Sequence, residues 1–111
     1  MTTPRIEIDL AKISHNATGL RALYGSRGID IFAVTKVVCG DPKIAHALVK
    51  TGLDTLADSR LSNIIRMREA GIQAQFVLSR TPAPTQVEST VKHADISLNS
   101  ELSVIERLSM V

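Results

Sequence analysis

The chain has 111 residues, of which 44% are hydrophobic and 22% are charged, and its formal net charge is +2. This length fits one domain with a modest core. Lysines and arginines are scattered among acids, which argues against a nucleic-acid or membrane surface, and only 3% of the residues are aromatic, so platforms for base stacking are not expected.

The single cysteine, Cys39, excludes an internal disulfide and a cysteine-rich zinc site, and we expect it to be a small buried thiol. The three histidines are far apart and show no metal-ligand spacing, so no metal is expected. The N-terminus lacks the charged and apolar regions of a signal peptide, and no apolar run approaches the ~20 residues that cross a bilayer. We therefore expect a cytoplasmic protein.

Residues 5–10 alternate between polar and apolar, which predicts a half-exposed strand. Asp9 can then cap a helix whose apolar residues recur at helical spacing until Gly25 ends it. We divide the chain into this N-terminal strand and helix, residues 1–28, and a remainder, residues 29–111, that belongs to the same domain.

A strand–helix unit then occurs four times, and this repeat predicts the fold class. The strands start about 20–24 residues apart, which is the length of one compact βα unit. Four units in series indicate an α/β fold with a parallel sheet and right-handed crossovers. The expected strand and helix pairs are 31–38 with 42–50, 54–58 with 60–70, 73–79 with 85–93, and 95–98 with 100–110.

Two architectures accept this pattern, an open doubly wound sheet and a closed (β/α)8 barrel. The first turn, VVCGDP, has neither phosphate-binding glycine pattern, which disfavours the open sheet. A complete barrel takes about 250 residues. We therefore predict a partial (β/α)8 TIM barrel of about four βα units preceded by a strand and a helix. Because the chain stops inside a helix, we expect it to be the front part of a longer enzyme.

Lys36 lies near the end of the first apolar run, IFAVTKVV. Alternation along a strand puts Phe32, Val34 and Lys36 on one face, which would be the barrel interior, and Thr35 and Val37 on the other. Burying an ammonium is costly, so one interpretation is a lysine whose charge reaches water at the strand end. The other is a reactive amine at the barrel mouth, able to form a Schiff base with a carbonyl substrate or with pyridoxal phosphate.

Arg80 follows the third strand and could reach the barrel mouth, toward a cofactor oxygen or a substrate carboxylate; an exposed loop arginine is the simpler interpretation. Polar residues at the ends of strands two and four are candidate ligands, although helix capping is the preferred interpretation because it explains them without a ligand: Asp58, Ser59, Asn99 and Ser100. The basic residues of the third helix indicate a solvated face: Arg60, Arg66 and Arg68.

Four stretches of the sequence carry a family resemblance: EIDLAKISHNATGLR, FAVTKVVCGDPKIA, LADSRLSNIIRMREAGI and ADISLNSELSVIERLS. They resemble, in order, the first strand and helix, the lysine-bearing barrel strand, and the second and fourth units of the alanine racemase family, the fold-type III pyridoxal-phosphate enzymes. TKVVCGD, LADSR and SLNSEL are most similar to the ornithine/alanine racemase branch. The resemblance covers the chain from Pro4 onward.

The resemblance implies that Lys36 holds pyridoxal 5'-phosphate as an internal aldimine and moves a proton on and off the substrate Cα. Lys36 is thus the predicted catalytic residue, and we predict cofactor contacts from Lys36, Arg80 and Asn99. Alanine racemases proper follow the lysine with a tyrosine-containing stretch, whereas VVCGD follows here. The phosphate contact of that tyrosine is therefore absent, which disfavours alanine. By resemblance, the small-molecule substrate is alanine or a larger cationic amino acid such as ornithine or lysine, and we prefer the cationic one.

A racemase needs a second acid/base on the opposite face of the substrate. In the family this is a tyrosine of a later domain, and Tyr24, the only tyrosine here, matches no such position. We expect no racemisation by these 111 residues alone. A non-catalytic pyridoxal-phosphate-binding protein and a structural half-barrel module remain alternatives. Unpaired strand edges and an exposed inner face predict a homodimer or another homo-oligomer.

Overall fold

The computed structural model describes residues 2–111. Its centre is a four-stranded parallel sheet with the strands in sequence order, β1-β2-β3-β4. The strands are β1 Ala33–Val34, β2 Thr55–Asp58, β3 Gln75–Leu78 and β4 Ile96–Ser97. Sequential order with parallel pairing is the arrangement of neighbouring strands in a barrel wall, and the predicted α/β fold is confirmed.

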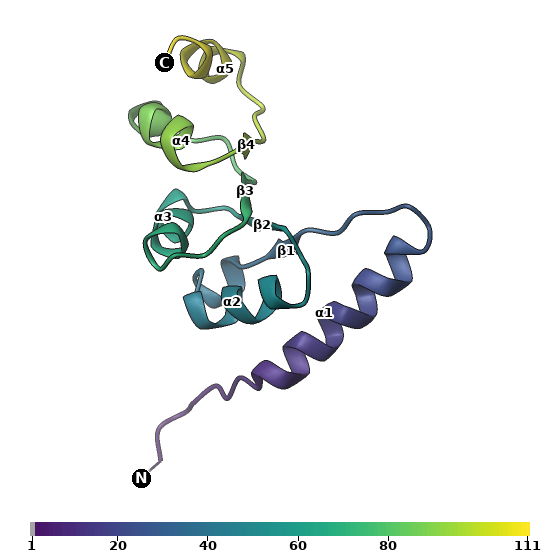
Figure 1. Cartoon of the computed structure of the whole chain (residues 1–111). Coiled ribbons are helices and arrows are strands. Elements are labelled where there is room, and N and C mark those ends of the chain that lie inside the picture. The colour runs from purple at the N-terminus through teal and green to yellow at the C-terminus, as the bar shows by residue number, and fades with distance from the viewer. Residues whose placement is uncertain (1) are drawn as a thin grey trace.

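Within residues 2–111, five α-helices and two 3₁₀-helices connect and flank the strands. They are α1 Leu10–Gly25, η1 Lys36–Val38, α2 Pro42–Lys50, α3 Leu61–Glu69, η2 Pro84–Gln86, α4 Val87–His93 and α5 Leu102–Ser109. Helices α2 to α5 follow one another along one side of the sheet, and α1 runs past α2 at the β1 end (Figure 1). One face of the sheet is thus covered by helices, while no helix of residues 2–111 covers the other.

Aspartate side chains cap the first two α-helices. Asp9 accepts a hydrogen bond from the Lys12 amide at 3.2 Å and caps α1, and Asp41 accepts one from the Lys43 amide at 2.8 Å and caps α2. Pro42 occupies the first position of α2, where no amide donor is needed. No helix of residues 2–111 is both long and apolar enough to cross a membrane.

The hydrophobic core lies between the sheet and its helices. The strand register places Leu56 beside Phe76 on the helix-facing side, and α3 packs over both. Burial of aliphatic and aromatic area is the main favourable contribution here, at about 25 cal/mol per Å². The buried cluster consists of Ala45, Leu56, Leu61, Ile64, Met67, Phe76 and Leu78.

The opposite face of the sheet carries a second apolar row. The register aligns Val34, Ala57, Val77 and Ile96 across the four strands. The two middle residues are buried by their neighbours, whereas Val34 and Ile96 at the edges are 52% and 39% exposed. The exposed inner face expected for four strands is therefore present.

The predicted N-terminal strand is not formed. Residues 2–9 adopt neither helix nor strand, and Ile6 is 89% exposed. An alternating pattern becomes a strand only where a neighbouring strand takes up its amides and carbonyls, and no strand of residues 2–111 pairs with this segment. The first strand of the sheet is also shorter than the predicted 31–38, because the chain enters η1 directly after Thr35.

Replacing Ile64 with Val should show how strongly α3 is held by the core. Ile64 is fully buried, and removing one methylene from such a site lowers the free energy of unfolding by about 0.5–1.5 kcal/mol. The matched control is Ile105→Val on α5, where the side chain is 45% exposed and the expected loss is below about 0.5 kcal/mol. Urea unfolding measures both, and equal losses would contradict the assigned core.

Candidate functional site

Lys36 is the first residue of η1 and lies at the carboxyl end of β1. Its side chain is exposed. Neither ion pair of residues 2–111 uses it, since these join Arg5 to Glu7 and Arg68 to Asp95. The residues described thus leave its amine free to react.

The two residues before Lys36 follow the predicted alternation, and the residue after it does not. Val34 is on the open face, and Thr35 is buried on the helix side, as predicted. Val37, predicted to share the face of Thr35, is instead 82% exposed. The alternation ends because η1 replaces strand geometry from Lys36 onward.

Thr35 holds the start of this turn, and all of its hydrogen-bonding groups are paired. Its amide donates to the carbonyl of Ala57 at 2.9 Å, and its hydroxyl donates to Asp58 Oδ2 at 2.7 Å. Its carbonyl accepts from the amides of Val38 at 3.2 Å and Gly40 at 3.1 Å. Thr35 is 1% exposed, so protein groups rather than water satisfy this residue.

Asp58 is the last residue of β2 and is fully buried. Besides the Thr35 hydroxyl on Oδ2, it accepts on Oδ1 from the Arg60 amide at 2.9 Å and from Asn63 Nδ2 at 3.1 Å. A buried carboxylate is tolerated only where donors replace its hydration. The carboxylate therefore joins the end of β1 to the start of α3.

The turn after Lys36 packs directly on α3. Cys39 and Gly40 both have positive φ, at 54° and 61°. A Cβ on Gly40 would lie 2.8 Å from Asn63 Cβ, and Arg66 Nη1 donates to the Cys39 carbonyl at 3.1 Å. Cys39 is exposed, so its predicted burial is wrong, because the left-handed turn takes the chain away from the sheet.

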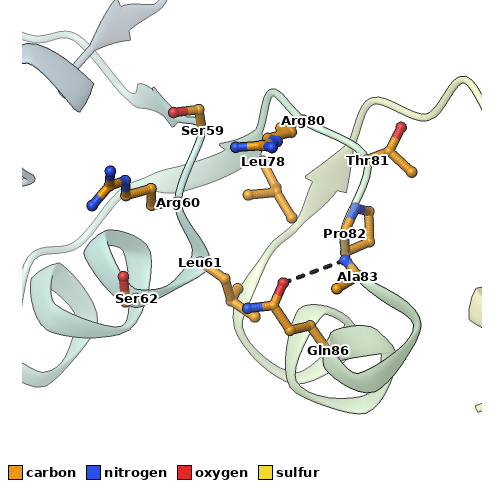
Figure 2. Close-up of a pocket in the computed structure, with 10 residues that line it drawn as sticks. All are labelled: Ser59, Arg60, Leu61, Ser62, Leu78, Arg80, Thr81, Pro82, Ala83 and Gln86. Atoms are coloured by element: carbon orange, nitrogen blue, oxygen red, sulfur yellow. Dashed lines mark hydrogen bonds between the residues drawn. The ribbon is translucent and has the colours of Figure 1, made fainter.

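Arg80 follows β3 and lines two cavities. The first, of about 470 Å³, lies between the turn into α3 and the segment before α4, where Arg80 and Ser59 occupy neighbouring positions (Figure 2). In the same view the Ala83 amide donates to Gln86 Oε1 at 3.3 Å. The second cavity, of about 490 Å³, is lined by Ser79, Arg80, Thr81, Leu98, Asn99 and Ser100.

The second cavity brings two predicted site residues together. Arg80 supplies guanidinium donors, and Asn99 Nδ2 donates to the carbonyl of Ser97 at 3.2 Å and to its hydroxyl at 2.9 Å. Asn99 Oδ1 is buried and has no partner among residues 2–111. A buried acceptor without a donor is costly. Lys36 lines neither cavity.

The predicted caps of α3 and α5 are placed differently in the structure. Arg60, rather than Ser59, is the N-cap residue of α3, and Glu101, rather than Asn99 or Ser100, is that of α5. Neither of the two residues caps its helix with a side-chain hydrogen bond. Asp58 still bonds the Arg60 amide, which is close to the capping role predicted for it.

Sequence reasoning missed the connection among three polar residues. Periodicity predicts only a face for Thr35 and a cap or ligand role for Asp58, and it connects neither of them to Asn63. A signal was present, because Thr35 and Asp58 interrupt the helix-facing side of their strands and Asn63 interrupts the buried side of α3. Three polar side chains buried together must satisfy one another.

No group of three or more His, Cys, Asp or Glu side chains within residues 2–111 is arranged to hold a metal ion.

Residues 8–109 match the family described as "Alanine racemase, N-terminal domain". Lysine racemase of Thermotoga maritima is 39% identical over 108 residues, covering 97% of this chain and 30% of that protein. Ornithine racemase of Acetoanaerobium sticklandii is 35% identical over 106 residues, covering 96% of this chain and 30% of that protein. The chain thus spans about three tenths of the length of these relatives.

Solved structures show the same fold at lower identity. D-threonine aldolase from Filomicrobium marinum superposes with a TM-score of 0.81 at 21% identity, covering 98% of this chain and 30% of that one. Alanine racemase from Oenococcus oeni superposes with a TM-score of 0.76 at 18% identity, covering 96% of this chain and 30% of that one. The arrangement of strands and helices is therefore that of the barrels of these enzymes.

Replacing Gly40 with Ala should destabilise the turn that carries Lys36. A left-handed residue other than glycine costs about 1–2 kcal/mol, and the clash with Asn63 adds roughly 1–3 kcal/mol. Gly28→Ala is the matched control, because its φ is 72° while nothing lies within 4 Å of the added Cβ. Equal losses in urea unfolding for the two variants would contradict the close packing of Gly40 on α3.

Proposed function

Because this chain belongs to the alanine racemase N-terminal domain family, we propose that it is the cofactor-binding front part of a pyridoxal-phosphate-dependent amino-acid racemase. The observation that supports the proposal most strongly is the position of Lys36. It lies at the carboxyl end of the first strand of a parallel sheet, exposed and outside the ion pairs of residues 2–111. Catalytic residues of barrel enzymes occupy this end of the strands.

The residues at the strand ends fit this cofactor. Lys36 offers a primary amine for its aldehyde, Arg80 offers a permanent positive charge for an anionic oxygen, and the unpaired Asn99 Oδ1 offers an acceptor for a hydroxyl or amine proton. We therefore assign all three to cofactor binding, with Lys36 as the covalent attachment. A cofactor-binding protein without catalysis would use the same three residues.

When bound, pyridoxal phosphate supplies an electron sink for the negative charge that develops at an amino-acid Cα. Lys36 contributes two actions of its own. Its amine would hold the cofactor through the aldehyde, and it would take a proton from the substrate Cα, or return one, on its own face. Arg80 and Asn99 hold the bound group in orientation.

The substrate we propose is a basic amino acid. Two relatives that match 96–97% of the chain are a lysine and an ornithine racemase, at 39% and 35% identity. Alanine racemases match 76–80% of the chain at 28–32% identity. The sequence identity is therefore higher, and the matched region longer, for the racemases of lysine and ornithine than for those of alanine.

Racemisation needs an acid/base on each face of Cα, and Lys36 supplies one. Tyr24, the only tyrosine of these 111 residues, lies on α1, and the α1 helix packs against α2 rather than on the open face of the sheet. We therefore expect cofactor binding without racemisation from these residues alone.

Lys36 should react with pyridoxal phosphate in preference to other exposed lysines. The chain is mixed with less than one equivalent of pyridoxal phosphate and reduced with borohydride, and its peptides are mapped by mass spectrometry. Lys36 should carry roughly fivefold or more label than Lys43, because a site that orients the cofactor favours its own amine. Lys43 is exposed on α2 and is the matched control.

Two variants complete this test. Lys36→Ala should remove the preferred label and leave that on Lys43 unchanged, and Lys43→Ala should leave Lys36 labelling intact. Equal labelling of the two lysines would contradict the cofactor role and favour the structural half-barrel.

We also propose that two copies of these 111 residues associate through the open face of the sheet, because pairing removes its apolar row from water.

Sedimentation velocity should show concentration-dependent association. Val34→Glu should weaken it roughly tenfold or more, because it places a charge in the interface. Leu102→Glu, at a position that is 70% exposed on α5, is the control and should leave it unchanged. A concentration-independent monomer would rule the association out.

A further inference from the structure

We propose that Thr35, Asp58 and Asn63 form a positioning network that fixes the direction of Lys36 from outside its own strand. The proposal rests on the proposed function, in which Lys36 carries the cofactor. None of the three residues is assigned to contact that cofactor. They act on the backbone on either side of Lys36.

The β1 strand by itself holds Lys36 weakly. It consists of two residues, and its ladder to β2 has two pairs of register partners. Lys36 already belongs to η1, whose 3₁₀ hydrogen bonds have poorer geometry than those of an α-helix. A catalytic side chain must be held within roughly 0.5 Å of its working position, so additional constraints on this turn are needed.

The first constraint acts on the residue before Lys36. The Thr35 hydroxyl donates to Asp58 Oδ2 at 2.7 Å, which fixes the side chain and so the orientation of the Thr35 carbonyl. That carbonyl accepts the amides of Val38 and Gly40. The hydrogen bonds that close the turn around Lys36 thus depend on a residue that Asp58 holds in place.

The second constraint acts on the end of the turn. Asn63 donates through Nδ2 to Asp58 Oδ1 at 3.1 Å, and its own Cβ and backbone lie against Gly40. One asparagine of α3 therefore contacts both the carboxylate and the turn. The segment from Thr35 to Gly40 is clamped at both ends to the second βα unit.

The burial of Asp58 supports a role in positioning. The side chain is 0% exposed, and neither ion pair of residues 2–111 includes it. An apolar residue would fill this place at lower desolvation cost. What the carboxylate adds is directional: it accepts three hydrogen bonds at once, one from the end of β1 and two from the start of α3.

The test uses two substitutions of Thr35 that separate shape from hydrogen bonding. Thr35→Val keeps the branched shape and removes the hydroxyl, whereas Thr35→Ser keeps the hydroxyl. The first readout is hydrogen exchange of the Val38 and Gly40 amides in the chain without cofactor. In Thr35→Val these should exchange roughly tenfold faster or more, with exchange in Thr35→Ser close to that of the parent chain. The Leu98 amide, bonded to the Leu78 carbonyl at 2.9 Å, is the distant control and should not change.

The second readout is the ratio of Lys36 to Lys43 labelling by pyridoxal phosphate and borohydride. It should fall at least roughly threefold in Thr35→Val and recover in Thr35→Ser. A residue with only a structural role would lower the unfolding midpoint without changing this ratio in the folded protein.

The outcomes separate the two proposals. If the parent chain shows no preference for Lys36 while Thr35→Val still speeds exchange at Val38 and Gly40, the cofactor role fails and the ordering of the turn stands. If Lys36 is preferred and Thr35→Val changes neither exchange nor labelling, the positioning network is overturned and the cofactor role stands.

A second variant covers loss of folding. If the Leu98 amide also loses protection in Thr35→Val, Asn63→Ala is measured instead, because it removes a single donor to Asp58 from the side of α3. It should speed exchange at Gly40 roughly threefold or more relative to Leu98. Unchanged exchange there would overturn the network.

Discussion

The hydrogen bond from the Thr35 hydroxyl to the Asp58 carboxylate, at 2.7 Å, is the interaction on which the candidate site depends. Both residues are buried, and they lie side by side in the sheet, since Thr35 directly follows β1 and Asp58 ends β2. The same carboxylate also accepts hydrogen bonds from the Arg60 amide and from the Asn63 side chain. One group therefore links the ends of β1 and β2 to the start of α3. The geometry around Lys36 is therefore a property of two βα units rather than of one strand.

A similar polar connection joins the third and fourth strands at their other end. Arg68 of α3 donates to Asp95 at 2.9 Å and to the His93 carbonyl, and its guanidinium lies 4.7 Å from the centre of the Phe76 ring. Asp95 in turn accepts the Phe76 amide. The prediction of a solvated basic face on α3 is thus wrong for Arg68, whose side chain connects the helix to residues at the start of β3 and β4. Arg66 also has a protein partner, because it donates to the Cys39 carbonyl.

The fold of this chain does not by itself identify a reaction. A D-threonine aldolase and an alanine racemase both superpose on this chain, at identities of 21% and 18%. One arrangement of strands and helices therefore accommodates differently named enzymes, as is usual for barrels. The reaction must be argued from particular side chains, and the ones that we propose at the strand ends are Lys36, Arg80 and Asn99.

The sequence by itself determined the order of elements, the parallel sheet and the position of Lys36. These follow from local signals: apolar runs with βα spacing, Asp41 and Pro42 at the start of α2, and glycines at helix ends. The tertiary structure decided the rest. Whether residues 2–9 form a strand depends on a partner strand, and whether Thr35, Asp58 and Asn63 meet depends on how α3 packs on the sheet. Hydrogen bonds between residues 5 and 23 positions apart cannot be read from periodicity, because periodicity reports which face a side chain takes and not which distant group it meets there.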